Sequence, residues 1–263
     1  MKHERSEKVF KAPPTAGNPF GLPLLQSPAS QSLLSMLFFL AACLLLIAVV
    51  ADAAVQSLAA SLDPSVKGML RFFTRFGNSA WPLGVGLALL AVVELLRRTG
   101  EPARPEGLDM CRSLLILLVA SVAISGVVSS LAKHMIGRIR PSAGPDAMVL
   151  DFSFMAFKSG WAAFPSGHAT TATAAALALA LCFPRQAWAL LALGVLAALS
   201  RALLGVHWLT DCLAGIGLGA VVTLLIYRRM VTAGHHFDIP DGTWSGIAAS
   251  LHRLAKAAVR RLS

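Results

Sequence analysis

The segment that decides the fold reads Ser-Arg-Ala-Leu-Leu-Gly-Val-His-Trp-Leu-Thr-Asp and runs from Ser200 to Asp211. It lies between two long apolar runs, so a cation, an imidazole and a carboxylate gather where a membrane helix ends. Ionisable groups are costly near hydrocarbon and usually mark function. If a helix begins after Gly205, His207 and Asp211 share one of its faces. The carboxylate can then bind one ring nitrogen and leave the other free to attack, while Arg201 offers donors suited to a phosphate.

Two further polar segments lie beside apolar runs. Residues 133–141, Lys-His-Met-Ile-Gly-Arg-Ile-Arg-Pro, follow the third run, and residues 165–168, Pro-Ser-Gly-His, open the fourth. Ser166 is a favourable helix N-cap, and Gly167 lets a bound group approach the backbone closely. The free N–H groups of a helix start form an anion site. Together with the first segment, these residues predict an oxyanion site for phosphoryl transfer.

The three segments resemble the signature of the type 2 phosphatidic acid phosphatase superfamily, which is Lys-x6-Arg-Pro, then Pro-Ser-Gly-His, then Ser-Arg-x5-His-x3-Asp. All three occur in order between residues 133 and 211. The resemblance implies a metal-independent phosphatase that works through a phosphohistidine. It makes His207 the nucleophile, Asp211 the group that orients it and His168 the acid for the leaving group. The implied phosphate-binding residues are Lys133, Arg140, Ser166, Gly167 and Arg201.

The composition is that of a membrane protein. Of the 263 residues, 56% are hydrophobic and only 14% are charged, and the mean hydropathy is +0.68. Soluble domains carry about 25% charged residues. The net charge of +10 does not indicate a nucleic-acid partner, because the basic residues lie mostly in short segments beside apolar runs, as membrane topology requires. The four cysteines show no paired spacing, so neither a disulfide framework nor a metal site is predicted.

Six apolar runs predict an all-α fold with six transmembrane helices, because each run is near the roughly 20 residues needed to cross a bilayer. We divide the chain into an N-terminal cytoplasmic tail (1–32), a six-helix membrane phosphatase domain (33–228) and a cytoplasmic tail with a basic amphipathic helix (229–263). The predicted spans are residues 33–53, 80–96, 113–131, 166–183, 186–204 and 209–227.

The distribution of lysine and arginine sets the orientation. The two tails and the loops after spans two and four carry fifteen of these cations, whereas the other three loops carry eight, three of them in the motifs. This asymmetry places both termini in the cytoplasm. All three motifs then fall on the opposite face, at the non-cytoplasmic ends of helices three to six. We therefore expect a bacterial inner-membrane protein whose active site faces the periplasm or the cell exterior.

Some features outside the motifs also carry predictions. The loop at 141–165 is rich in aromatic residues and should contact lipid, and residues 63–76 should form a short helix on the outer membrane surface. We interpret His134 as structural and Arg138 as a rim charge. The sequence around Asp52 faintly resembles a signal-peptidase site, but the preceding segment is too long, which favours an uncleaved anchor. Gly215 and Gly219 are interpreted as a packing step within the chain.

The predicted activity is hydrolysis of a lipid phosphate monoester or diphosphate, with no cofactor. Phosphatidate, phosphatidylglycerol phosphate, a polyprenyl diphosphate and a lipid A phosphate all fit the motifs. A phosphotransferase that uses the same phosphohistidine remains an alternative. An anion transporter is less favoured, because transporter sites lie near the midplane at repeat interfaces, and a haloperoxidase would be soluble. The sequence leaves the oligomeric state open.

Overall fold

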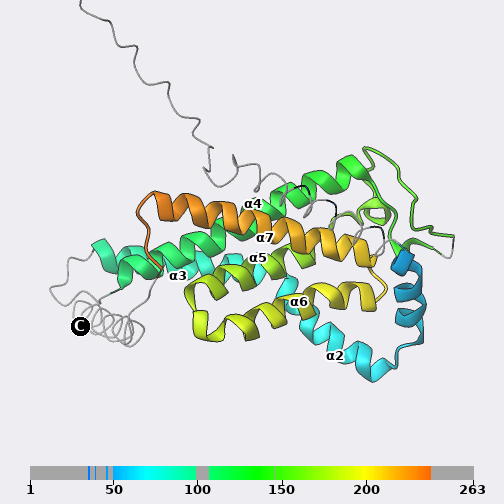
Figure 1. The fold of residues 1–263 in the computed structure, drawn as a ribbon, viewed down its shortest axis with the longest axis horizontal. Helices are drawn as coiled ribbons and strands as arrows, with labels where there is room; N and C mark the ends of the chain where they lie inside the picture. Colours follow the sequence, from blue (N-terminus) through cyan, green and yellow to red (C-terminus); the bar gives the residue numbers. More distant parts are fainter. Residues whose placement is uncertain are drawn as a thin grey trace, which may run out of the picture. The chain divides into compact units, whose positions relative to one another are not determined.

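The computed structural model describes residues 50–98, 107–144 and 146–237, together with Ser35, Phe39 and Leu46. The chain divides into two compact units, Met1–Ile47 and Ala48–Ser263, and all the helices below belong to the second (Figure 1). Residues 50–61 are helical. The longer helices that follow are α2 (Pro64–Thr74), α3 (Ala80–Arg98), α4 (Leu108–Ile136), α5 (Gly167–Cys182), α6 (Ala187–Leu203) and α7 (Leu209–Thr232). Short 3-10 helices are η2 (Arg75–Gly77), η3 (Pro141–Ala143), η4 (Ser159–Trp161) and η5 (Pro184–Gln186).

The all-α prediction is confirmed, since the described residues contain no strand. One isolated β-bridge joins Arg138 to Phe152. Four helical segments are long and apolar enough to cross a membrane, namely Pro64–Arg98, Leu108–Ile136, Pro184–Leu203 and Leu209–Thr232, while α5 is shorter.

The predicted spans from the second to the sixth correspond to α3 through α7. The first predicted span and the amphipathic helix of the C-terminal tail lie largely or wholly outside the described residues. The predicted domain boundary at residue 228 falls inside a helix, because α7 continues to Thr232.

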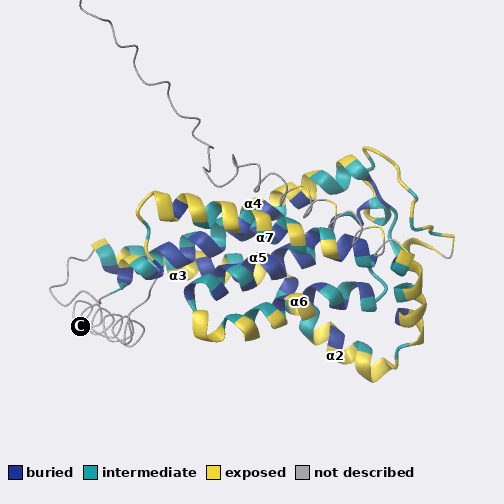
Figure 2. Ribbon diagram, in the orientation of Figure 1, coloured by how far each residue is buried: buried dark blue, intermediate teal, exposed yellow. Residues whose placement is uncertain are grey.

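Helix α5 is the centre of the bundle. It packs against α4, α6 and α7, and 11 of its 16 residues are buried, as its dark colour in Figure 2 shows. Small residues permit this close packing. A Cβ at Gly194 of α6 would lie 2.6 Å from the Ala176 side chain. On α7, a Cβ at Gly215 would lie 2.5 Å from the carbonyl oxygen of the α5 N-cap residue, and one at Gly219 would lie 2.5 Å from an α5 carbonyl oxygen. The predicted packing role of the two α7 glycines is therefore confirmed.

The ends of α4 and α5 are set by local signals that lie next to the motifs. Helix α4 ends at Gly137, whose φ of 60° is left-handed and whose N–H bonds to the carbonyl of Lys133, as a helix C-cap glycine does. A Cβ at Gly137 would lie 1.7 Å from the carbonyl oxygen of Ser153, so only glycine fits there. Helix α5 begins after Ser166, whose side chain accepts a bond from Ala169 N–H at 3.5 Å. These two signals turn the chain at one end of the bundle.

Charged residues also gather at the ends of α3 and α4 away from the motifs. The Glu94 carboxylate lies 3.3 Å from both Arg97 and Arg98 and 3.5 Å from Arg112. Arg97 also lies 2.8 Å from Asp109 in the first turn of α4. These ion pairs join the end of α3 to the start of α4.

Candidate functional site

The predicted site residues gather at one end of the helix bundle. Lys133 lies in the last turn of α4, and Ser166 to His168 form the start of α5. Arg201 lies in the last turn of α6, and Asp211 in the first turn of α7. His168 is within electrostatic range of the charged side chains from the other motifs. The structure thus brings together residues that are up to 78 positions apart in the sequence.

His207 and Asp211 form a buried pair, but they do not share a helix face as predicted, because α7 begins at Leu209 and His207 lies in the loop before it. The His207 ring is 2% exposed and the Asp211 carboxylate is fully buried. Nδ1 of His207 lies 3.5 Å from Oδ2 of Asp211, too far and too poorly aligned for a full hydrogen bond. Contacts of this kind often tighten when substrate binds. The backbone carbonyl of His207 accepts a 2.8 Å bond from Gln56 Nε2, which holds the loop before α7.

Burial keeps His207 neutral. It is the main cause that lowers the pKa of the imidazole below its usual value, and the Asp211 carboxylate opposes it. Arg140 and Arg201 add to the lowering. A neutral imidazole has a lone pair on one nitrogen. Because Nδ1 faces Asp211, that lone pair is available at Nε2 when Nδ1 carries the proton.

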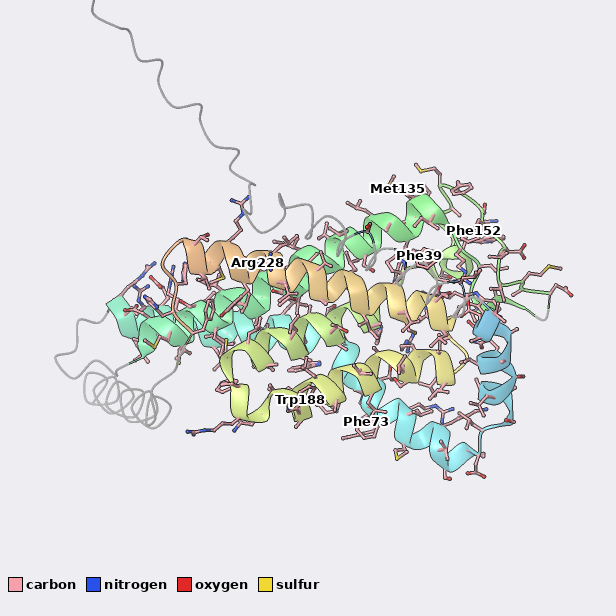
Figure 3. All side chains as sticks on the ribbon, viewed as in Figure 1. Phe39, Phe73, Met135, Phe152, Trp188 and Arg228 are labelled. Carbon is pink, nitrogen blue, oxygen red and sulfur yellow. The ribbon has the colours of Figure 1, made fainter. Side chains whose placement is uncertain are left out.

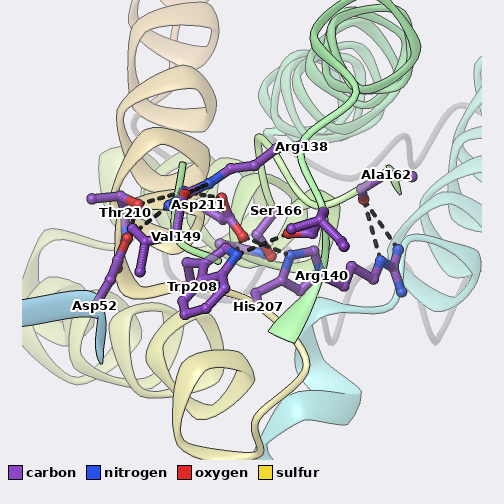
Figure 4. Close-up of polar contacts among 12 residues, drawn as sticks. Asp52, Arg138, Arg140, Val149, Ala162, Ser166, His207, Trp208, Thr210 and Asp211 are labelled. Carbon is purple, nitrogen blue, oxygen red and sulfur yellow. Dashed lines mark hydrogen bonds and ion pairs between the residues drawn. The ribbon is translucent and has the colours of Figure 1, made fainter. Parts of the chain in front are cut away.

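Arg138 is the main correction to the sequence analysis. It is not a rim charge, because its side chain is 3% exposed and lies at the centre of a polar network (Figure 4). Nη1 donates to Oδ1 of Asp211 at 2.6 Å, and Nη2 donates to Oδ2 of Asp52 at 2.8 Å. Nη1 also donates to Thr210 Oγ1 at 2.6 Å, and Nε and Nη2 both donate to the Val149 carbonyl. One guanidinium therefore joins two buried carboxylates.

Asp52 completes this network from the first described helix. Its two oxygens accept bonds from the backbone N–H of Thr210 at 2.9 Å and from the Thr210 hydroxyl at 2.6 Å. Asp52 thereby caps the start of α7 from a segment about 160 residues earlier. The sequence held a signal for this role, since an ionisable residue within an apolar run is a functional candidate by default. On the sequence alone, Asp52 is assigned only to a weak processing motif.

The start of α5, where the sequence predicts an anion site, has one backbone N–H donor already engaged. The Ser166 N–H donates to the Asp211 carbonyl at 2.9 Å, and its hydroxyl caps Ala169. Ser166 therefore joins the second motif to the third, and the following N–H groups of the first helical turn are the ones left without intrahelical partners. A Cβ on Gly167 would lie 3.0 Å from Lys133 Nζ. Glycine at this position lets the lysine approach the helix start.

The cations of the candidate site form no ion pair with a carboxylate in the described part of the chain. Within residues 50–98, 107–144 and 146–237, no ion pair involves Lys133, Arg140 or Arg201. Nε and Nη2 of Arg140 donate to the Ala162 carbonyl at 3.4 and 3.2 Å, and Nη1 of Arg201 donates to Thr74 Oγ1 at 3.5 Å. Burial lowers the pKa of Arg140. Partly buried cations held only by neutral acceptors favour binding of an anion.

The described residues contain no group of three or more His, Cys, Asp or Glu side chains that could hold a metal ion.

The apolar helices, with a polar site at their ends, define an integral membrane protein that binds an anionic group. A family model described as the PAP2 superfamily matches residues 114–235, which include all three motifs. The chain belongs to the PAP2 superfamily.

Known proteins with similar sequences are phosphatases. The chain is 32% identical over 195 residues to a lipid A 1-phosphatase of Rhizobium johnstonii, a match covering 72% of this chain and 78% of that protein. It is 27% identical over 162 residues to an undecaprenyl-diphosphatase of Sulfolobus acidocaldarius, covering 61% and 69%. Its fold is similar to the crystal structure of a transmembrane PAP2-type phosphatidylglycerolphosphate phosphatase from Bacillus subtilis. That match has a TM-score of 0.51 and 21% identity, and it covers 80% of this chain and 90% of the other.

The Arg138 network generates a stability prediction. Replacing Arg138 with alanine leaves the Asp52 and Asp211 carboxylates buried without their cation, and breaking a buried ion pair in this way costs about 3–5 kcal/mol. We expect a large fall in the thermal midpoint of the purified protein in detergent. The matched control is Arg185→Ala in the exposed η5 turn, which should leave the midpoint unchanged. Equal midpoints for both variants would show that the network does not stabilise the fold.

Proposed function

We propose that this protein hydrolyses a phosphate ester or diphosphate of a membrane lipid through a phosphohistidine. The observation that carries the proposal is the neutral, buried His207, which has Asp211 at one ring nitrogen and unpaired cations nearby. This is the arrangement that an activated nucleophile needs, with a side chain oriented by a third group and donors for the developing charge.

In the proposed reaction, Nε2 of His207 attacks the phosphorus and forms a P–N bond while the bond to the leaving oxygen breaks. His168 gives its proton to that oxygen. Lys133, Arg140, Arg201 and the backbone N–H groups at the start of α5 stabilise the non-bridging oxygens. Water then attacks the phosphohistidine, with His168 acting as base, and phosphate is released. Asp211 stabilises the imidazolium formed during the first step.

The Arg138 contact holds one oxygen of the Asp211 carboxylate in this mechanism. Nη1 of Arg138 donates to Oδ1 at 2.6 Å. Oδ2 accepts from the Trp208 N–H at 2.8 Å, which fixes the carboxylate plane beside the His207 ring. In the proposed mechanism, Asp211 therefore orients the nucleophile.

The names of similar proteins support a lipid with an exposed phosphate as the substrate. These proteins include ones named for lipid A 1-phosphate, undecaprenyl diphosphate and phosphatidylglycerolphosphate. Among these, a lipid A-type phosphate is our first candidate, because the lipid A 1-phosphatase match covers more of the chain at higher identity. We further propose six membrane spans, cytoplasmic termini and a site on the opposite face, as the cation distribution predicts.

The aromatic loop provides a lipid-facing surface beside the site. Figure 3 shows Phe152 at the end of the bundle where α4 ends. The loop is tied down at Gly137, whose carbonyl accepts the Ser153 N–H at 2.7 Å. Phe154 and Phe157 are each 74% exposed, and Phe157 stacks on His134 with ring centroids 5.1 Å apart. Large exposed aromatics beside a membrane site are best explained by contact with lipid.

The nucleophile is tested by substitution. His207→Ala should abolish phosphate release, because no P–N bond can form. Asp211→Asn should retain a small residual rate, since loss of an orienting group has cost about 10⁴-fold elsewhere without ending catalysis. The measurement is phosphate release from a lipid phosphate in detergent, with the melting temperature of each variant as the control for folding. A His207→Ala enzyme as active as the parent would exclude this mechanism.

The charge-stabilising groups are tested by inhibitors. We expect full activity in excess EDTA, because the proposed mechanism assigns charge stabilisation to protein cations. Vanadate should inhibit competitively, because it mimics the five-coordinate transition state and such analogues bind tightly. Phosphate release is measured with each reagent. Activity that vanishes in EDTA and returns with magnesium would contradict the mechanism.

The loop is tested with paired substrates. Phe154→Ala combined with Phe157→Ala should weaken hydrolysis of a long-chain lipid phosphate more than that of a short soluble phosphate ester, because acyl contacts supply binding energy remote from the phosphorus. Trp188→Ala, an exposed aromatic near the start of α6, is the matched control. Equal losses on both substrates, in a folded protein, would make the loop structural.

A further inference from the structure

A polar cavity of about 200 Å³ adjoins the His168 side of the site. Its walls come from the segment between α2 and α3, from α4 and from the first turn of α5. His168, Gly167 and Lys133 form the border that the cavity shares with the proposed phosphate site. The remaining lining has no part in the proposed reaction.

The α4 wall follows one helix face away from the site. Gly126, Ser129, Ser130 and Lys133 line the cavity, and their spacing of three and four residues places them on one face. Seven residues of helix cover about 10 Å. The cavity therefore extends from the cation at Lys133 towards the middle of α4, a helix long and apolar enough to span the membrane.

Ser129 in this wall carries a buried hydroxyl group that lacks a hydrogen-bond partner among the described residues. Its side chain is 1% exposed, and its hydroxyl has no hydrogen-bond partner within the described part of the chain. A buried hydroxyl without a partner costs about 1–3 kcal/mol, and polar groups inside membrane spans commonly mark substrate pathways. Ser130 and Thr171 add hydroxyls, and Asn78 from the opposite wall adds an amide. The lining is thus suited to hydrogen-bonding a ligand.

The position of the cavity identifies which part of a substrate it would hold. In the proposed reaction, His168 protonates the leaving oxygen, so the group attached to that oxygen lies on the His168 side. We infer that this cavity binds the carrier of the phosphate and that the carrier is a neutral, hydroxyl-bearing ring, the terminal sugar of a glycolipid phosphate. This inference rests on the proposed function and specifies its substrate.

Size and charge favour a sugar over the alternatives. A cavity of about 150 Å³ holds a benzene ring, so about 200 Å³ has room for one six-membered ring. A second phosphate would bring further negative charge, but the only lysine or arginine in the lining is Lys133, which already faces the start of α5. A purely apolar chain would leave the Ser129 hydroxyl without a partner.

The chain offers a substitution that fills the cavity without disturbing its walls. A Cβ at Gly126 would meet nothing within 4 Å, so Gly126→Leu places its side chain in open space. Gly217→Leu on α7 is the matched control, because a Cβ there also meets nothing within 4 Å and this glycine is not part of the cavity lining. Ser129→Ala removes the hydroxyl and leaves the shape nearly unchanged.

The experiment measures kcat/KM for full-length protein in detergent with a diacylated glucosamine 1-phosphate, a long-chain alkyl monophosphate and a polyprenyl diphosphate. The ratio of the sugar phosphate to the alkyl phosphate should fall about three- to tenfold in Ser129→Ala, the effect of one hydrogen bond. It should fall further in Gly126→Leu and stay unchanged in Gly217→Leu.

The outcomes separate the two proposals. An unchanged ratio in both cavity variants, with the parent active, would overturn the sugar site and leave the phosphatase proposal intact. A fall in kcat/KM of the cavity variants that is confined to the polyprenyl diphosphate would overturn the sugar assignment. It would show that the cavity binds a second phosphate. A folded parent enzyme that releases phosphate from none of the three lipids would contradict the proposed function and the sugar site with it.

Discussion

The buried contact between Arg138 and the two carboxylates Asp52 and Asp211 is the interaction on which this structure most depends. Removing three ions from water is expensive, and their mutual attraction offsets this cost only when the geometry is good and the remaining donors are satisfied. Here four of the hydrogen bonds donated by Arg138 are 2.8 Å or shorter. The network joins the first described helix, the segment after α4 and the start of α7, so these three elements cannot shift independently.

The same network separates the charges of the site. Asp52 and Asp211 both contact Arg138, whereas Lys133, Arg140 and Arg201 have no carboxylate contact within the described ranges. His207 lies between the two groups, with Nδ1 towards Asp211. A phosphate that approaches the other side therefore meets unpaired cations and the positive end of a helix. In the low dielectric of a buried site, such donors stabilise negative charge more strongly than they do in water.

Helix α5 supplies the second constraint. Its 16 residues cover about 24 Å, less than the roughly 30 Å of a bilayer core. Its start lies level with Lys133, about one turn before α4 ends at Ile136. Alanine, threonine and the facing glycines let α6 and α7 close around this helix. The N–H groups of its first turn are consequently recessed within the bundle, where the cavity beside His168 can also reach them.

The sequence by itself determined helices α3 to α7 and the residues of the candidate site, because their signals are local. Asp211 lies in the first turn of α7 with His207 in the short loop just before it, Ser166 caps α5, and Gly137 ends α4 in a conformation only glycine adopts easily. The distribution of lysine and arginine, together with the order of the motifs, then predicts that the motif-bearing helix ends lie on one side of the membrane. None of these signals depends on how distant segments pack.

Only the tertiary structure decided the role of Arg138 and its partners. Arg138 and Arg140 are two residues apart and equally basic, and nothing local distinguishes the buried one from the one left for an anion. The difference arises because Asp52, 86 residues earlier, and Asp211, 73 residues later, converge on one guanidinium. A carboxylate finds its cation through the packing of whole helices, and sequence spacing carries no information about contacts of that range.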